Sequence, residues 1–118
     1  MSNYLPKIDT HSVITRSASA DVAGGQLVAV SGSKTVAPSA ADSAAVLGVA
    51  LSDAKTGQAV SVSLGGVQRP VADGDIAAGV KVFSAAAGKV SATGTNNPIG
   101  IALETAASGA QVEVQMAR

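Results

Sequence analysis

The segment LGVAL at residues 47–51 recurs as IGIAL at residues 99–103, 52 residues further along the chain. The same spacing continues downstream, because the alternating VSV of residues 60–62 matches the VEV of residues 112–114. A match sustained over this distance predicts two copies of one supersecondary unit. Each copy contains an apolar strand, an Ala-x-x-Gly turn and an alternating, half-buried strand.

The repeat extends upstream with a slightly different spacing. The segment GQLVAV at residues 25–30 resembles GVKVFS at residues 79–84, which lies 54 residues later. The first of these segments is followed by a Ser-Gly-Ser-Lys turn and a short apolar stretch, which is a β-hairpin pattern. We therefore expect an internal repeat that spans about residues 25–64 and 79–116.

These patterns predict an all-β fold without an amphipathic helix. We expect a small β-barrel or sandwich, β-tulip- or β-clip-like, built from two similar hairpin-containing halves. Gly48 and Gly100 interrupt apolar strands, which indicates close backbone approach or a bend at a barrel corner. Residues 39–45 are alanine-rich and predict at most one short helical turn.

The first twenty residues differ from the rest because they contain no glycine. We interpret residues 1–20 as an extended N-terminal arm and linker, followed by a single β domain at residues 21–118. Residues 10–16 could instead form a first strand, and the sequence leaves both interpretations open. The N-terminus lacks the apolar stretch of about 7–15 residues that a secretory signal needs, so we expect no targeting segment.

The composition predicts a thinly filled core. Hydrophobic residues make up 47% of the chain, but 24 residues are Ala, 16 are Val, and only Tyr4 and Phe83 are aromatic. Alanine contributes little buried area compared with Leu, Ile or Phe. Association with other subunits could supply the missing burial, so we expect an oligomer or a surface-bound protein.

Several functional classes are excluded or disfavoured by composition. A chain without cysteine has neither a disulfide framework nor a cysteine-ligated metal site. The formal net charge is zero and the arginines are scattered, which disfavours a nucleic-acid binder. The longest uncharged apolar run, residues 44–51, is far shorter than the roughly 20 residues that span a bilayer. We therefore expect no nucleic-acid or membrane partner.

The residues capable of chemistry form no recognisable site. His11 is the only histidine and lies in the arm, without a Gly-x-Ser-x-Gly elbow in the chain. The Asp73-Gly74-Asp75 stretch lacks the further oxygen ligands of a calcium loop and predicts a turn that an Asp stabilises by bonding its own backbone. Glu104 and Glu113 do not define a glycosidase pair without geometry. We expect no catalytic residue, metal or cofactor, and a binding or structural protein rather than an enzyme.

The order and spacing of several short segments resemble the capsid cement, or head decoration, proteins of tailed bacteriophages. The resemblance covers roughly residues 20–116. The segments that carry it are residues 25–28, 46–50, 75–82, 99–104 and 107–109 with the strand that follows.

This resemblance implies a structural virion protein that binds the outer surface of the expanded capsid and stabilises it. The implied partners are the major capsid protein and other copies of the chain, as a homotrimer. The implied location is the capsid exterior, after assembly in the host cytoplasm. By analogy with the arms of such proteins, the candidates for capsid contact are Tyr4, Leu5, Ile8, Val13 and Ile14.

Two alternatives remain open from the sequence. The turn at residues 75–79 also resembles turns in sugar-acid-related modules, so the chain could be a small β-clip module that binds a ligand or glycan. A small hydrolase that uses His11 is the third and weakest hypothesis.

Overall fold

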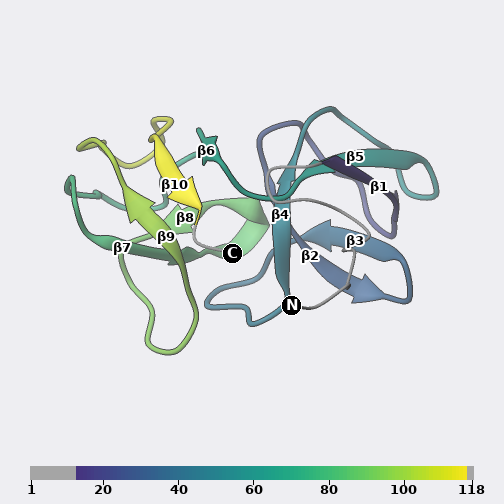
Figure 1. The fold of residues 1–118 in the computed structure, drawn as a ribbon, viewed down its shortest axis with the longest axis horizontal. Helices are drawn as coiled ribbons and strands as arrows, with labels where there is room; N and C mark the ends of the chain where they lie inside the picture. Colours follow the sequence, from purple (N-terminus) through teal and green to yellow (C-terminus); the bar gives the residue numbers. More distant parts are fainter. Residues whose placement is uncertain (1–12, 117–118) are drawn as a thin grey trace, which may run out of the picture.

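A computed structural model describes residues 13–116. Figure 1 shows the two halves of the chain side by side, the first at right and the second at left. The described residues contain one short 3₁₀ turn, η1 (Ala86–Gly88). The strands of the first half are β1 (Val13–Ala18), β2 (Leu27–Gly32), β3 (Thr35–Pro38), β4 (Val46–Ala50) and β5 (Ala59–Ser63). Those of the second half are β6 (Val67–Gln68), β7 (Lys81–Ser84), β8 (Val90–Ser91), β9 (Pro98–Ala102) and β10 (Val114–Met116).

The first half is a closed barrel with the strand order β1-β3-β2-β4-β5. Strands β2 and β3 form the antiparallel hairpin that the sequence predicts. Strand β1 closes the barrel, since it pairs antiparallel with β5 and parallel with β3. In β5 the side chains of Val60 and Val62 are buried inside, while Ser61 and Ser63 are partly exposed. The predicted all-β fold class is confirmed.

The second half repeats this arrangement in a sheet with the order β6-β10-β9-β7-β8. Between β1 and β5, Val13 pairs with Ser63, and between β6 and β10 the equivalent Val67 pairs with Gln115. In the parallel pairing of β1 with β3, Ala18 pairs with Val36. The equivalent residues of the second half, Ala72 and Val90, form an isolated parallel bridge. The two similar halves expected from the sequence are therefore present.

Equivalent turns precede β2 and β7. The amide of Gly25 donates to the carbonyl of Ala50, and the amide of Gly79 donates to the carbonyl of Ala102, both at 2.8 Å. The two glycines have φ angles of 91° and 86°, in the left-handed region that disfavours other residues. Each half thus ties the start of its hairpin to the end of its central strand in the same way.

The repeat begins earlier than the sequence predicts, at residues 13 and 67. Residues 13–18, predicted as part of the arm and linker, form β1, so the first-strand interpretation is correct for this stretch. Its side chains at Ile14 and Ala18 are buried in the barrel. The strand lacks a hairpin signal because its partners β3 and β5 are distant in sequence. Residues 39–45 form turns rather than the short helical turn predicted for them.

The cores of the two halves share residues at their junction. One cluster, which includes Ile14, lies inside the first-half barrel. The other lies in the second half, but Leu27, Val46 and Val49 of the first half belong to it. Because β2 and β4 complete the core of the second half, the two halves pack as one hydrophobic unit.

A carboxylate in the loop after β3 also joins the halves. Asp42 accepts hydrogen bonds from the amide and hydroxyl of Thr95, both at 3.1 Å, and from the amides of Asn96 at 3.2 Å and Asn97 at 3.0 Å. These donors, above all the amide of Thr95, lower the pKa of Asp42 below its ordinary value. The ionised carboxylate therefore stabilises the contact between the two loops.

The glycines inside β4 and β9 give the first testable prediction. A Cβ on Gly48 would overlap the carbonyl oxygen of Ser63, and a Cβ on Gly100 would overlap that of Gln115. We expect Gly48→Ala and Gly100→Ala each to lower the free energy of unfolding by about 2–3 kcal/mol, measured by urea denaturation. Gly74→Ala is the control, because its Cβ would meet nothing within 4 Å and only its φ of 91° opposes alanine. Equal losses in all three variants would contradict this steric account.

Asp42 gives a prediction with a defined pH dependence. Its folded-state pKa is lowered, so its contribution to stability is present above the unfolded-state pKa of about 3.9 and is lost as the pH falls through the folded-state value. We expect Asp42→Asn to unfold at a lower temperature than the parent chain at pH 7, with a difference that shrinks below about pH 4. Asp73→Asn, at an exposed position, is the control. A difference that is the same at pH 7 and pH 3 would refute the role of the charge.

Candidate interaction surface

The buried polar side chains of residues 13–116 are used in structural hydrogen bonds. This part of the chain contains no group of three or more His, Cys, Asp or Glu residues placed to bind a metal ion, and its buried side-chain polar atoms all have partners. The hydroxyl of buried Ser39 donates to the carbonyl of Ala85 at 3.3 Å, and that of Ser84 donates to Ala40 at 2.8 Å. Nor do these residues include a helix that is long and apolar enough to cross a membrane.

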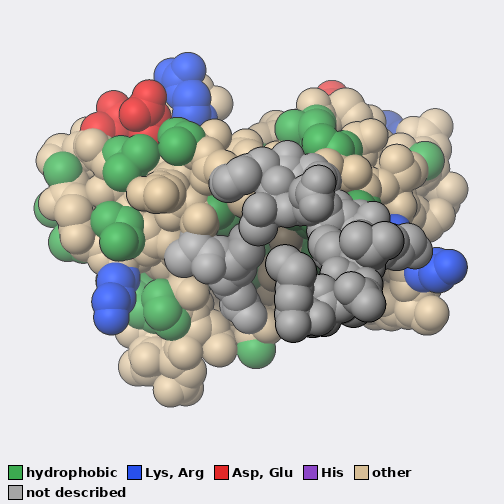
Figure 2. Space-filling view, in the orientation of Figure 1, with side chains coloured by type: hydrophobic (Ala, Val, Ile, Leu, Met, Phe, Trp, Pro, Cys, Tyr) green, Lys and Arg blue, Asp and Glu red, His purple; other side chains and the backbone are tan. Residues whose placement is uncertain are grey.

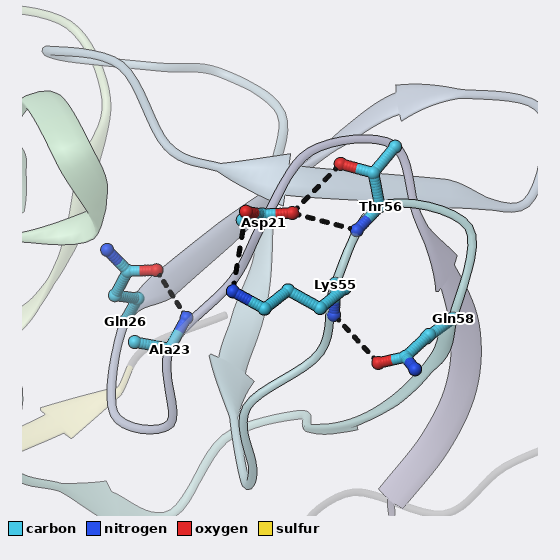
Figure 3. A network of polar contacts seen from close by, with 6 residues as sticks. All are labelled: Asp21, Ala23, Gln26, Lys55, Thr56 and Gln58. Atoms are coloured by element: carbon cyan, nitrogen blue, oxygen red, sulfur yellow. Dashed lines mark hydrogen bonds and ion pairs between the residues drawn. The ribbon is translucent and has the colours of Figure 1, made fainter.

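Figure 3 shows a network of polar contacts in the first half. The carboxylate of Asp21 accepts hydrogen bonds from the amide and hydroxyl of Thr56, at 2.9 and 3.0 Å, and lies 3.8 Å from the ammonium of Lys55. The amide of Thr56 is the main cause of the lowered pKa of Asp21. Gln58 accepts from the amide of Lys55 at 2.9 Å. The network fixes the turn before β5 against the segment that follows β1.

The second half contains the corresponding contact at the acidic stretch noted in the sequence. Residues 73–75 form a bend at Gly74, whose φ is 91°, so the predicted turn is confirmed. Asp75 accepts a hydrogen bond from the amide of Ser108 at 3.0 Å, whereas the sequence predicts an Asp that bonds its own backbone. Asp75 and Ser108 occupy the positions of Asp21 and Thr56 in the first half, so both contacts brace turns.

The other candidates for chemistry are also placed by the structure. Glu104 accepts a hydrogen bond from the backbone amide of Glu113 at 2.9 Å, and both residues are exposed. The carboxylate of Glu104 therefore stabilises the loop after β9. His11 lies outside the described residues.

Large hydrophobic side chains remain exposed at equivalent positions of the two halves. Val13 and Val67 are equivalent and are 50% and 56% exposed, and Leu51 and Leu103 are equivalent and are 52% and 44% exposed. Ile101 is also exposed, on the outer face of the second-half sheet. Figure 2 shows hydrophobic side chains over this face at left, with acidic side chains near its upper edge. The exposed apolar groups that recur in both halves are candidates for contact with a partner.

The structure separates the predicted capsid-contact residues into different groups. Tyr4, Leu5 and Ile8 lie outside the described residues. Val13 is exposed at the beginning of β1, whereas Ile14 is only 9% exposed and packs in the core of the barrel. Of the two candidates that the structure describes, Val13 alone has an exposed side chain.

The exposed leucines are contact candidates that were not predicted from the sequence. Leu51 and Leu103 end the two apolar runs, which favoured buried strands throughout. In the structure both residues come directly after β4 and β9, where the chain bends. The apolar stretches that these leucines end did not predict their exposure, although the 52-residue repeat shows that the two positions are equivalent.

Comparisons with known proteins agree with this architecture. A family model described as phage cement protein matches residues 8–117. No curated protein matches the chain. Among solved structures, the chain resembles the N base of the head fiber gp8.5 of bacteriophage phi29, with a TM-score of 0.75 and 21% sequence identity over 90% of this chain and 93% of that one. The structural likeness shows a shared fold, and the family model spans nearly all of the sequence. The chain therefore belongs to the phage cement protein family.

Proposed function

We propose that this phage structural protein binds the outer surface of the expanded capsid and stabilises the shell, without a catalytic role. Membership of the phage cement protein family is the observation that carries this proposal. The proposed partners are the major capsid protein and other copies of the chain, as a homotrimer on the exterior of a particle assembled in the host cytoplasm.

The surface and composition are consistent with such a role. Apolar side chains recur at matched positions of the two halves, where a repeating lattice could meet them. Modest contacts made by many copies add up when each copy is held on the same shell. A formal net charge of zero limits repulsion between copies that lie close together.

The residues proposed to reach the capsid protein are Tyr4, Leu5 and Ile8, together with Val13 at the beginning of β1. Val13 is the first residue of β1 and its side chain is exposed, so it could continue a contact made by the residues before it. Ile14 is omitted from this group because its side chain fills the barrel.

Co-sedimentation with heads of the source phage tests the proposed function. We expect saturable binding to expanded heads and little binding to unexpanded heads, and decorated heads should release DNA at a higher temperature than bare ones. An absence of binding to both forms would refute the proposal. Specific binding in a glycan array without binding to heads would favour a ligand-binding module instead.

A truncation tests the proposed role of the N-terminal residues. Deletion of residues 1–12 removes Tyr4, Leu5 and Ile8 but leaves β1, which a longer deletion would remove from the barrel. We expect the truncated chain to keep its circular dichroism spectrum and to bind expanded heads at least about tenfold more weakly, a loss of about 1.4 kcal/mol. Unchanged head occupancy by the folded truncated chain would count against a contact by this segment.

A further inference from the structure

Each half contains a groove at the same place in its fold. In the first half the groove has a volume of about 440 Å³ and is lined by residues 15–17 of β1, residues 33–35 of the β2–β3 hairpin, and Ala59. In the second half the groove is about 190 Å³ and is lined by Arg69, Val71, residues 87–89 and Gln111. Each of these second-half residues lies 54 or 52 positions after a residue that lines the first-half groove, so the two grooves are equivalent.

The second-half groove is already covered by a turn of the polypeptide. Residues 23–26 of the first half form its remaining wall. The side-chain amide of Gln26 donates to the carbonyl of Ala87 at 3.0 Å. Gly88 is buried beneath this turn, and a Cβ there would lie 2.6 Å from the Cβ of Gln26. This groove therefore accommodates a tight turn, provided that glycine lines it.

The first-half groove has no such cover in the described chain, and its lining is cationic. Lys34 stands at the position of Gly88 and is exposed, and Arg16 lies opposite on β1. Arg16 donates to the carbonyl of Thr15 at 2.9 Å, and no carboxylate lines the groove. The ion pair found within residues 13–116 joins Lys55 to Asp21, away from this groove.

A second copy of the chain fits this groove poorly. If a neighbour repeated the internal packing, its turn at residues 77–80 would enter the groove, followed by Lys81 at the position of Leu27. Lys81 would then approach Lys34 and Arg16, and like charges brought together without partners oppose binding. The side chain of Lys34 would also occupy the space that Gly88 leaves free in the second half.

We propose that the first-half groove binds an acidic loop of a partner protein, with Arg16 and Lys34 as the groups that pair with its carboxylates. Arginine can hold a carboxylate through two parallel hydrogen bonds, and lysine adds a mobile positive charge. Val13 lies two residues before the groove and shares a face of β1 with the lining residues Thr15 and Ser17, so its apolar side chain could extend the contact along that face. The loop belongs to the capsid protein, an assignment that rests on the proposed function.

The test compares two double variants that change the net charge equally. Arg16→Glu/Lys34→Glu alters the first-half groove, and Lys81→Glu/Lys89→Glu alters two exposed cations of the second half. With expanded heads of the source phage, we expect the groove variant to bind at least about tenfold more weakly and the control variant to change less than about twofold. Binding of the unmodified chain should also weaken as salt is raised. Equal losses in both variants, or none in either, would overturn the proposal, provided that both melt like the unmodified chain.

If the unmodified chain does not bind heads, the proposed function is refuted but the acidic-loop site is not. A second probe then tests this site directly. Hexaglutamate is titrated into the ¹⁵N-labelled chain and followed by NMR. We expect amide shifts concentrated at residues 15–17 and 33–35, and their loss in Arg16→Glu/Lys34→Glu. Shifts spread equally over Lys81 and Lys89, or an absence of shifts, would contradict an acidic-loop site.

Discussion

Close packing of the backbone at two glycines is the constraint on which the fold depends. Gly48 in β4 lies against the carbonyl of Ser63, and Gly100 in β9 lies against the carbonyl of Gln115. With no Cβ at these positions, the central strand of each half can approach its neighbour and curve around a narrow core. A narrow core suits a chain in which Ala and Val supply most of the hydrophobic residues.

The two halves diverge where one of them covers the other. Leu27 and Val49 pair across β2 and β4 and are buried at the junction, while the equivalent Lys81 and Ile101 pair across β7 and β9 and are exposed. Gly88 is buried under the first half, whereas its equivalent Lys34 is exposed. The two halves thus have equivalent surface positions. At each pair of equivalent positions named here, the contact between the halves buries one residue and leaves the other exposed. Two of the uncovered members, Lys81 and Lys34, carry positive charge, which opposes head-to-tail association of copies and leaves these positions for other partners.

The sequence predicted the class and the duplication because both depend on local signals. Hydrophobic alternation, glycine turns and the match of residues 47–51 with residues 99–103 can be read within short windows. Strand β1 was ambiguous because its partners β3 and β5 lie far along the chain. The grooves could not be predicted for the same reason. The first is formed where β1 meets the turn before β3, and the second where residues 69–71 meet residues 87–89. The exposure of Leu51 was hidden by the apolar run that it ends.

A cryo-electron microscopy reconstruction of expanded heads decorated with this protein tests the central claim most directly. The account predicts density for the chain on the outer surface of the shell, with the first-half groove and the exposed side of β1 turned toward a loop of the capsid protein that carries Asp or Glu. Density on the outer surface with this groove facing solvent would contradict the proposed contact. The absence of the chain from the outer surface would contradict the cement function itself.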